Sequence, residues 1–173
     1  MKLMYTIHNY DVRLFTSLTN SALHAGLAAF CRRLSKTADG LLYVLLAALL
    51  LWQHGVSDPL LQVMVLGFLL ERPLYFLLKN GFKRNRPQQA LTGFRSVITP
   101  SDQFSFPSGH TSAAFMVATM VSYFFPALAP GLYAWALAIG FSRVVLGVHF
   151  PTDTLMGAVL GSFTAFISLN SIL

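Results

Sequence analysis

Long apolar runs separated by short polar breaks dominate the chain. The first run lies at about 39–52 and is almost pure Leu, Ala and Val. The second covers about 59–79 and is preceded by Asp58 and Pro59, which are suited to the start of a helix. Three more runs lie at about 111–125, 131–148 and 153–169. Such runs are typical of helices that cross the apolar core of a membrane, so the pattern predicts five transmembrane helices.

The first 36 residues follow a different pattern. Between Tyr5 and Arg33, apolar side chains recur at steps of three and four residues, with polar and basic residues between them: Leu14, Phe15, Leu18, Ala22, Leu23, Leu27 and Phe30. This spacing is typical of an amphipathic helix lying in the membrane interface. We therefore expect an all-α integral membrane bundle in one domain over residues 1–173, with an interfacial helix over residues 1–36.

Composition supports the membrane assignment. Of the 173 residues, 55% are hydrophobic and only 10% are charged. A soluble domain carries about 25% charged residues, so this chain cannot cover a water-facing surface. The net charge of +6 comes from basic residues at the ends of apolar runs, where lipid headgroups or an anionic substrate are expected rather than nucleic acid. The single cysteine, Cys31, excludes an internal disulfide.

Polar residues gather at one end of the predicted bundle, which we call the active face. It contains the start of the first span, the end of the second, the start of the third, the end of the fourth and the start of the fifth. Polar side chains in so apolar a chain are usually functional. Those at the active face are Lys79, Arg86, Ser108, His110, Arg143, His149 and Asp153. Three cations and two imidazoles together favour the binding and cleavage of a phosphoryl dianion.

Several of these residues suit phosphate binding. Ser108 and Gly109 at a helix start would direct free backbone N–H groups toward a phosphoryl oxygen, and glycine allows a close approach. Arg86 and Arg143 offer planar guanidinium groups that match phosphate oxygens, while Lys79 supplies a point charge. No cluster of acidic residues is suited to hold magnesium, so we expect no metal and no cofactor.

The remaining residues suit catalysis. His149 and Asp153 are four residues apart and would share one helix face. Asp153 could then fix the imidazole tautomer and leave the second ring nitrogen of His149 free as a nucleophile. His110, which belongs to a different span, could protonate the leaving oxygen.

The order of these residues matches a known signature: Lys79-x6-Arg86-Pro87, Pro107-Ser108-Gly109-His110 and Ser142-Arg143-x5-His149-x3-Asp153. It resembles the three-part signature of the type 2 phosphatidic acid phosphatase superfamily. The resemblance implies a metal-independent membrane phosphatase that works through a phosphohistidine. It implies that His149 is the nucleophile, Asp153 its orienting partner and His110 the acid. It also implies that the phosphoryl group is bound by Lys79, Arg86, Ser108, Gly109 and Arg143.

The leading hypothesis is hydrolysis of a lipid phosphate monoester or diphosphate in a membrane. Undecaprenyl diphosphate, phosphatidate and phosphatidylglycerophosphate all remain open as substrates. One alternative is transfer of the phosphoryl group to another lipid, because an alcohol can also attack a phosphohistidine. A second alternative is a protein that binds or transports lipid phosphates without turnover, although both catalytic histidines are present.

Three other features have structural interpretations. Lys83 and Arg84 lie outside the signature and are interpreted as a basic flank that anchors a span to anionic lipid. Glu71 and Arg72 lie within the second span, where a supporting structural role is favoured over a direct one. Gly157 and Gly161 favour close helix packing, either within the chain or in a homodimer.

The distribution of basic residues bears on orientation in a bacterial inner membrane. All 12 except Arg72 fall on the active face, which the positive-inside rule would place in the cytoplasm. Three of them, Lys79, Arg86 and Arg143, are explained by phosphate binding. Many bacterial members of the resembled family work on the outer face. The balance slightly favours a cytoplasmic active face.

Overall fold

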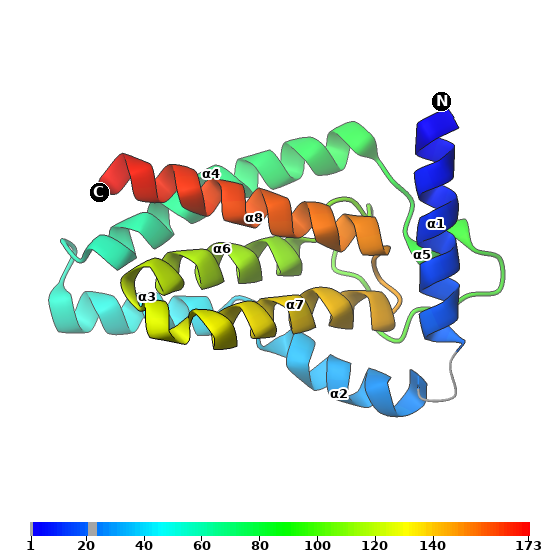
Figure 1. The fold of residues 1–173 in the computed structure, drawn as a ribbon, viewed down its shortest axis with the longest axis horizontal. Helices are drawn as coiled ribbons and strands as arrows, with labels where there is room; N and C mark the ends of the chain where they lie inside the picture. Colours follow the sequence, from blue (N-terminus) through cyan, green and yellow to red (C-terminus); the bar gives the residue numbers. More distant parts are fainter. Residues whose placement is uncertain (1, 21–23) are drawn as a thin grey trace.

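A computed structural model describes residues 2–20 and 24–173, which form helices with no strand among them. Five helices lie side by side as a bundle: α3 (Leu41–His54), α4 (Pro59–Phe82), α6 (Gly109–Phe124), α7 (Ala129–Val145) and α8 (Pro151–Ile172) (Figure 1). At one end of the bundle lie α1 (Lys2–Thr19) and α2 (His24–Lys36). Two short helices, α5 (Pro87–Ala90) and η1 (Pro126–Leu128), belong to the connections. The predicted all-α membrane bundle is confirmed.

Local sequence sets both ends of α4. The side chain of Asp58 accepts a hydrogen bond from the backbone N–H of Leu61 at 2.8 Å, and Pro59 occupies the first helical position. At the other end Lys83 adopts a left-handed conformation with φ of 47°, and its N–H bonds to the carbonyl oxygen of Lys79 at 3.1 Å. The helix therefore delivers Lys79 to the active face.

Four segments are long and apolar enough to cross a membrane: Ala25–His54, Pro59–Ala90, Pro126–Val145 and Pro151–Ile172. The remaining predicted span, the third at about 111–125, corresponds to α6, which has 16 residues. At 1.5 Å per residue it extends only about 24 Å, less than a membrane core of about 30 Å. Most of its residues are buried, because α6 packs against α4, α7 and α8. It therefore serves as the centre of the bundle.

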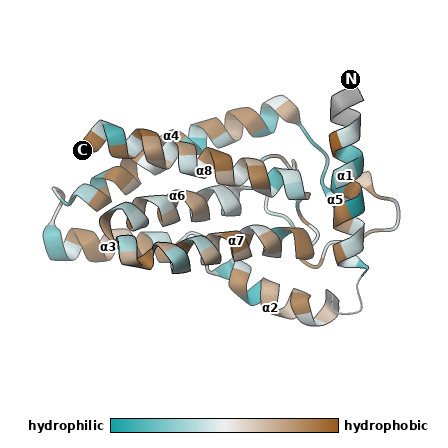
Figure 2. Cartoon of the chain, in the orientation of Figure 1, coloured by the Kyte–Doolittle hydropathy of each residue, from teal (hydrophilic) through white to brown (hydrophobic). Residues whose placement is uncertain are grey.

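The outer surface of the bundle is apolar. Large hydrophobic side chains are exposed on several helices, including Val44 of α3, Leu69 of α4 and Phe166 of α8. Hydrophobic residues are spread along the helices of the bundle, whereas hydrophilic ones are more frequent at the helix ends and in the connections (Figure 2). An apolar surface of this extent is suited to contact with lipid rather than water.

Gly157 and Gly161 of α8 pack against the backbone of α6. A Cβ atom on Gly157 would lie 2.5 Å from the carbonyl oxygen of Ser108, and one on Gly161 would lie 2.0 Å from that of Ser112. Only glycine permits this approach. The two glycines therefore act within the chain, and they bring the starts of α6 and α8 together at the active face.

The amino-terminal region is not the single helix that the sequence predicts. It forms two helices, because α1 ends at Thr19 and is followed by Asn20, a residue with low helix propensity. The predicted apolar stripe includes Ala22 and Leu23, which lie outside the described residues. The prediction of one continuous helix from Tyr5 to Arg33 is therefore wrong.

Both amino-terminal helices bury apolar residues against the protein. Phe15 of α1 is fully buried, with its ring centroid 4.9 Å from that of Phe94 and 5.5 Å from that of Phe150. Cys31 of α2 packs in a buried cluster with Leu146. Part of the apolar stripe of this region is therefore buried against the loops of the active face. The helices α1 and α2 cover these loops.

Candidate active site

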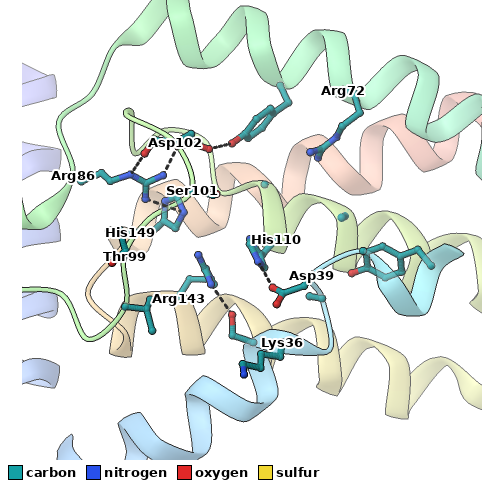
Figure 3. A pocket seen from close by; sticks show the side chains of 18 of the residues that line it. Lys36, Asp39, Arg72, Arg86, Thr99, Ser101, Asp102, His110, Arg143 and His149 are labelled. Carbon is teal, nitrogen blue, oxygen red and sulfur yellow. Dashed lines mark hydrogen bonds and ion pairs between the residues drawn. The ribbon is translucent and has the colours of Figure 1, made fainter. Parts of the chain in front are cut away.

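The helix ends at the active face surround a cavity of about 730 Å³. Of the eight site residues predicted from the sequence, five line this cavity: Arg86, Gly109, His110, Arg143 and His149 (Figure 3). The other three are buried behind its wall: Lys79, Ser108 and Asp153. The structure therefore brings all eight to one region, but only five face the space that a substrate would occupy.

His149 lies in the turn between α7 and α8 and is 2% exposed. Its Nε2 atom is 3.5 Å from a guanidinium nitrogen of Arg86, on the cavity side. Its Nδ1 atom is 3.8 Å from Oδ2 of Asp153, which is longer than a hydrogen bond. The predicted pair is thus adjacent, with Nδ1 toward the carboxylate and Nε2 toward Arg86.

Asp153 is held by donors other than His149. Its Oδ2 accepts from the hydroxyl of Ser105 at 2.5 Å and from the backbone N–H of Phe150 at 2.8 Å. Its Oδ1 accepts from the guanidinium of Arg84 at 2.7 Å. The carboxylate therefore fastens the long loop, the turn and the start of α8 to one another beside His149.

The interpretation of Arg84 as a lipid anchor is wrong. Besides Asp153, its guanidinium pairs with the buried carboxylate of Asp11 in α1 at 2.7 Å. Asp11 also accepts from the backbone N–H of Thr152 at 3.0 Å. Arg84 lies between two buried carboxylates because an ionised group in an apolar interior requires an opposite charge. Lys83 is exposed, as a basic flank would be.

Asp102, in the long loop, is a cavity residue that sequence reasoning missed. Its carboxylate accepts from Lys79 Nζ at 2.8 Å and from the Tyr75 hydroxyl at 2.6 Å, and it also pairs with Arg86. Burial alone would raise the pKa of Asp102, but these donors outweigh that effect and lower the pKa to about 2. Lys79 and Arg86 are therefore fixed by a permanent negative charge at the cavity wall.

The two arginines of the cavity are also oriented by neutral acceptors. Arg86 donates to the carbonyl oxygen of Val148 at 2.6 Å. Arg143 donates to the hydroxyl of Ser35, in α2, at 2.6 Å, and its Nε atom has no hydrogen-bond partner among the described residues. Each guanidinium is thus oriented by a hydrogen bond to a protein oxygen atom. Arg143 keeps donor capacity for an anion in the cavity.

The surroundings of His149 favour its neutral form. Burial lowers the pKa of His149 to about 4, because the imidazolium would lose its hydration. The Asp153 carboxylate opposes this effect, while the charges of Arg86 and Arg143 add to it. At neutral pH the ring therefore carries a free lone pair, as a nucleophile requires.

Ser108 and Gly109 connect the start of α6 to its neighbours. The Ser108 N–H donates to the carbonyl oxygen of Asp153 at 2.9 Å, and its hydroxyl bonds with that of Thr111 at 2.9 Å. Gly109 faces the Tyr75 ring, which a Cβ atom would approach to 3.0 Å. Ser108 thus joins α6 to α8 behind the cavity, whereas Gly109 forms part of the cavity wall.

His110, the second residue of α6, is paired with an acidic residue that sequence reasoning missed. Its Nε2 atom lies 2.8 Å from Oδ1 of Asp39, in the turn between α2 and α3 (Figure 3). No spacing in the sequence signals this pair, because 71 positions separate the two residues.

Glu71 and Arg72 lie deeper in the bundle. Glu71 is fully buried, accepts from the hydroxyl of Ser112 in α6 at 2.6 Å and pairs with Arg72. Glu71 thus links α4 to α6, in agreement with the supporting role favoured by the sequence. The guanidinium of Arg72 lies over the Tyr75 ring, 4.8 Å from its centroid, and lines the cavity.

An apolar groove of about 610 Å³ continues from the cavity between α3 and α4. Its walls include Val44, Ala47 and Met64. Four residues line both spaces: Gly40, Tyr43, Phe68 and Arg72. A polar cavity at the end of a membrane bundle and an apolar groove along its side therefore form one continuous site.

Comparison with known proteins shows which family the chain resembles in sequence. A family model described as the PAP2 superfamily matches residues 59–172. Phosphatidylglycerophosphatase B of Bacillus subtilis is 34% identical over 137 residues, which cover 73% of this chain and 64% of that protein. The chain thus spans a little less than two thirds of the length of this curated relative.

Solved structures show the same fold. Aquifex aeolicus LpxE superposes with a TM-score of 0.81 at 31% identity, over 92% of this chain and 94% of its own. The transmembrane PAP2 type phosphatidylglycerolphosphate phosphatase from Bacillus subtilis superposes with a TM-score of 0.79 at 25% identity, over 96% of this chain and 86% of its own. Fold and sequence agree that the chain is a multi-pass membrane protein and belongs to the PAP2 superfamily.

Proposed function

We propose that the protein hydrolyses a phosphate monoester or diphosphate on a membrane lipid through a phosphohistidine. One observation carries the proposal: His110 and His149 face a single cavity with Arg86 and Arg143, and this cavity continues into an apolar groove. A lipid phosphate combines the two chemistries that these spaces would accept. The relative named as a phosphatidylglycerophosphatase supports the same class of substrate.

The phosphoryl group would bind between the two cavity arginines. Arg86, from the loop after α4, and Arg143, from α7, both line the cavity, and their guanidinium groups suit the paired oxygens of a phosphate. The start of α6 adds the positive end of a helix dipole beside Gly109. Lys79 would contribute from behind, through its ion pair with Asp102. These charges would meet the dianion without a metal ion.

Hydrolysis would take two steps. Nε2 of His149 attacks phosphorus while the bond from phosphorus to the lipid oxygen breaks, and His110 gives its proton to that oxygen. Asp153 stabilises the positive charge on the His149 ring from the Nδ1 side. Water then attacks the phosphohistidine and loses its proton to His110, which releases inorganic phosphate and restores both histidines.

The apolar part of the substrate would occupy the groove between α3 and α4. Beyond the four residues that it shares with the cavity, the groove has an entirely apolar lining, which includes Val44, Met64 and Leu69. It suits acyl and isoprenoid chains alike. Phosphatidylglycerophosphate, phosphatidate and undecaprenyl diphosphate therefore all fit this proposal. Selectivity among them would depend on contacts with the headgroup.

The test is phosphate release by the purified protein from these three lipids, with excess chelator present. We expect inorganic phosphate from at least one lipid, an undiminished rate with chelator, and inhibition by vanadate, which mimics a pentacoordinate phosphoryl group. A new phosphorylated lipid in place of free phosphate would establish phosphoryl transfer instead. Binding of all three lipids without turnover would establish a non-catalytic protein.

We also infer that the active face lies on the cytoplasmic side. The helices α1 and α2 lie at this end and add Arg32, Arg33 and Lys36 to its charge. Arg84 no longer counts as free charge, because it pairs with two carboxylates. The test is labelling of a Thr92→Cys variant in a Cys31→Ser background, since Thr92 is exposed in the long loop. Modification by an impermeant maleimide in intact spheroplasts would contradict the inference.

A further inference from the structure

The acid proposed for the reaction, His110, has a partner that the family match does not include. Asp39 lies outside residues 59–172, so the family signature says nothing of it. Its carboxylate contacts Nε2 of His110 at 2.8 Å, and both residues line the cavity. This contact is the starting point for assigning Asp39 a role.

The turn that carries Asp39 is anchored rather than loosely placed. Ser35, at the end of α2, accepts a hydrogen bond from Arg143 at 2.6 Å. Thr37 accepts one from the indole N–H of Trp135, in α7, at 2.9 Å. The next residue, Ala38, is buried. Two polar contacts with α7 and one buried side chain therefore fix the position from which Asp39 reaches His110.

A glycine directs the chain away immediately after Asp39. Gly40 has φ of 100°, a conformation that residues with a Cβ atom rarely adopt. A Cβ atom added there would meet no other atom within 4 Å, so the backbone conformation rather than crowding favours glycine. This turn starts α3 at Leu41 while the Asp39 side chain stays in the cavity. Backbone geometry and anchoring thus both favour a fixed carboxylate beside His110.

The surroundings of His110 explain why a carboxylate beside the ring would favour its protonated form. Burial lowers the pKa of His110, and the charges of Arg143 from α7 and Arg72 from α4 add to this effect, whereas Asp39 opposes it. An acid must carry its proton when the substrate arrives. Without Asp39, no carboxylate would contact the ring to oppose these effects. The ring would then be neutral more often and would present no fixed N–H group.

We propose that Asp39 is a positioning residue for His110. Its carboxylate holds the N–H at Nε2 and so leaves the N–H at Nδ1 to protonate the leaving oxygen of the lipid. A carboxylate that accepts from one imidazole nitrogen keeps the proton on that nitrogen and favours the imidazolium form, in which the other nitrogen also carries a proton. The inference rests on the proposed function, in which His110 is the acid.

The experiment compares two substrates with the same phosphoryl group and different leaving groups. A short-chain phosphatidate releases a basic alkoxide that needs a proton, whereas p-nitrophenyl phosphate releases a stable phenolate that does not. We expect Asp39→Asn to lower kcat/KM for phosphatidate by about 10- to 100-fold, because acid catalysis contributes about 10²- to 10⁴-fold in total. For p-nitrophenyl phosphate the change should be less than about threefold on the same grounds. Asp39→Glu should restore part of the phosphatidate activity.

The matched control is Asp58→Asn, which removes a carboxylate at the opposite end of α3. It should leave the ratio of the two kcat/KM values unchanged. Thermal melting of each variant in detergent establishes that it is folded. An equal loss with both substrates, or no loss with either, would overturn the role of Asp39.

His110→Gln separates this inference from the function on which it depends. A selective loss in His110→Gln together with a wild-type ratio in Asp39→Asn would overturn the inference alone. No phosphate release by the wild-type protein from either substrate would overturn both. The selective loss in both variants, larger in His110→Gln, is the result we expect.

Discussion

Each of the two cavity histidines lies beside an aspartate, and the two pairs differ in almost every other respect. His149 and Asp153 are four positions apart and are 2% and 0% exposed. The side chains of His110 and Asp39 are 24% and 53% exposed, and the residues come from distant parts of the chain. The buried carboxylate is saturated by Ser105, Arg84 and a backbone N–H, whereas the open one bonds directly to its histidine.

This difference matches the two roles proposed for the imidazoles. A nucleophile must present a lone pair, and burial without a close hydrogen bond keeps His149 neutral. An acid must gain and lose protons in every cycle, and the Asp39 carboxylate favours the proton on the half-buried His110 ring, against the effect of burial. Environments that separate the proton affinities of two like groups are typical of paired catalytic residues. The contrast between the pairs therefore supports the two proposed roles.

The strongest test removes the buried histidine. His149→Gln should lower phosphate release by about 10⁴-fold or more, because the variant lacks the nitrogen proposed to attack phosphorus. Rapid acid quench with radiolabelled substrate should trap a phosphoenzyme in the wild-type protein and none in the variant. Activity near the wild-type level in this variant would contradict the assignment of roles to the two pairs.

A second test weakens the support of the buried pair without touching the histidine. Arg84→Gln leaves the buried carboxylates of Asp11 and Asp153 without their cation, which should destabilise the protein by about 3 kcal/mol. Turnover should fall as well, because Asp153 would no longer be fixed beside His149. Thermal melting and phosphate release measure the two effects.

The control for this variant is Lys83→Gln, which removes the neighbouring exposed charge. It should change the melting temperature by little, since an exposed charge contributes less than about 1 kcal/mol. Equal melting temperatures for the two variants would show that the Arg84 network does not stabilise the active face.

The smallest effect is the titration of His149. Because burial lowers its pKa to about 4, we expect its ring nitrogens to titrate well below the ordinary value of 6.5. Nitrogen-15 spectra of histidine-labelled protein in detergent, assigned with His149→Gln, measure this midpoint. The unfolded chain takes up this proton below pH 6.5 and the folded protein only below about pH 4, so stability should fall as pH decreases across that interval. A midpoint near 6.5 would contradict the buried, neutral state of the ring.

The sequence alone predicted the features that depend on local interactions. Asp58 and Pro59 start α4 because a cap and its helix are adjacent in the chain. His149 and Asp153 lie close because they flank the start of α8 and are only four positions apart in the chain. Alternating helix directions place the ends of five apolar runs at one face, so the eight signature residues gather there without any knowledge of helix packing.

The tertiary structure decided which charges meet. An apolar interior requires that each buried ion find an opposite charge, but it does not specify which one. Only the paths of the long loop and of α1 and α2 bring Asp102 to Lys79, Asp11 to Arg84 and Asp39 to His110. The same paths divided the amino-terminal stripe into two helices that pack on the protein. These contacts join residues 23 to 73 positions apart, so no periodicity or capping pattern along the chain could indicate them.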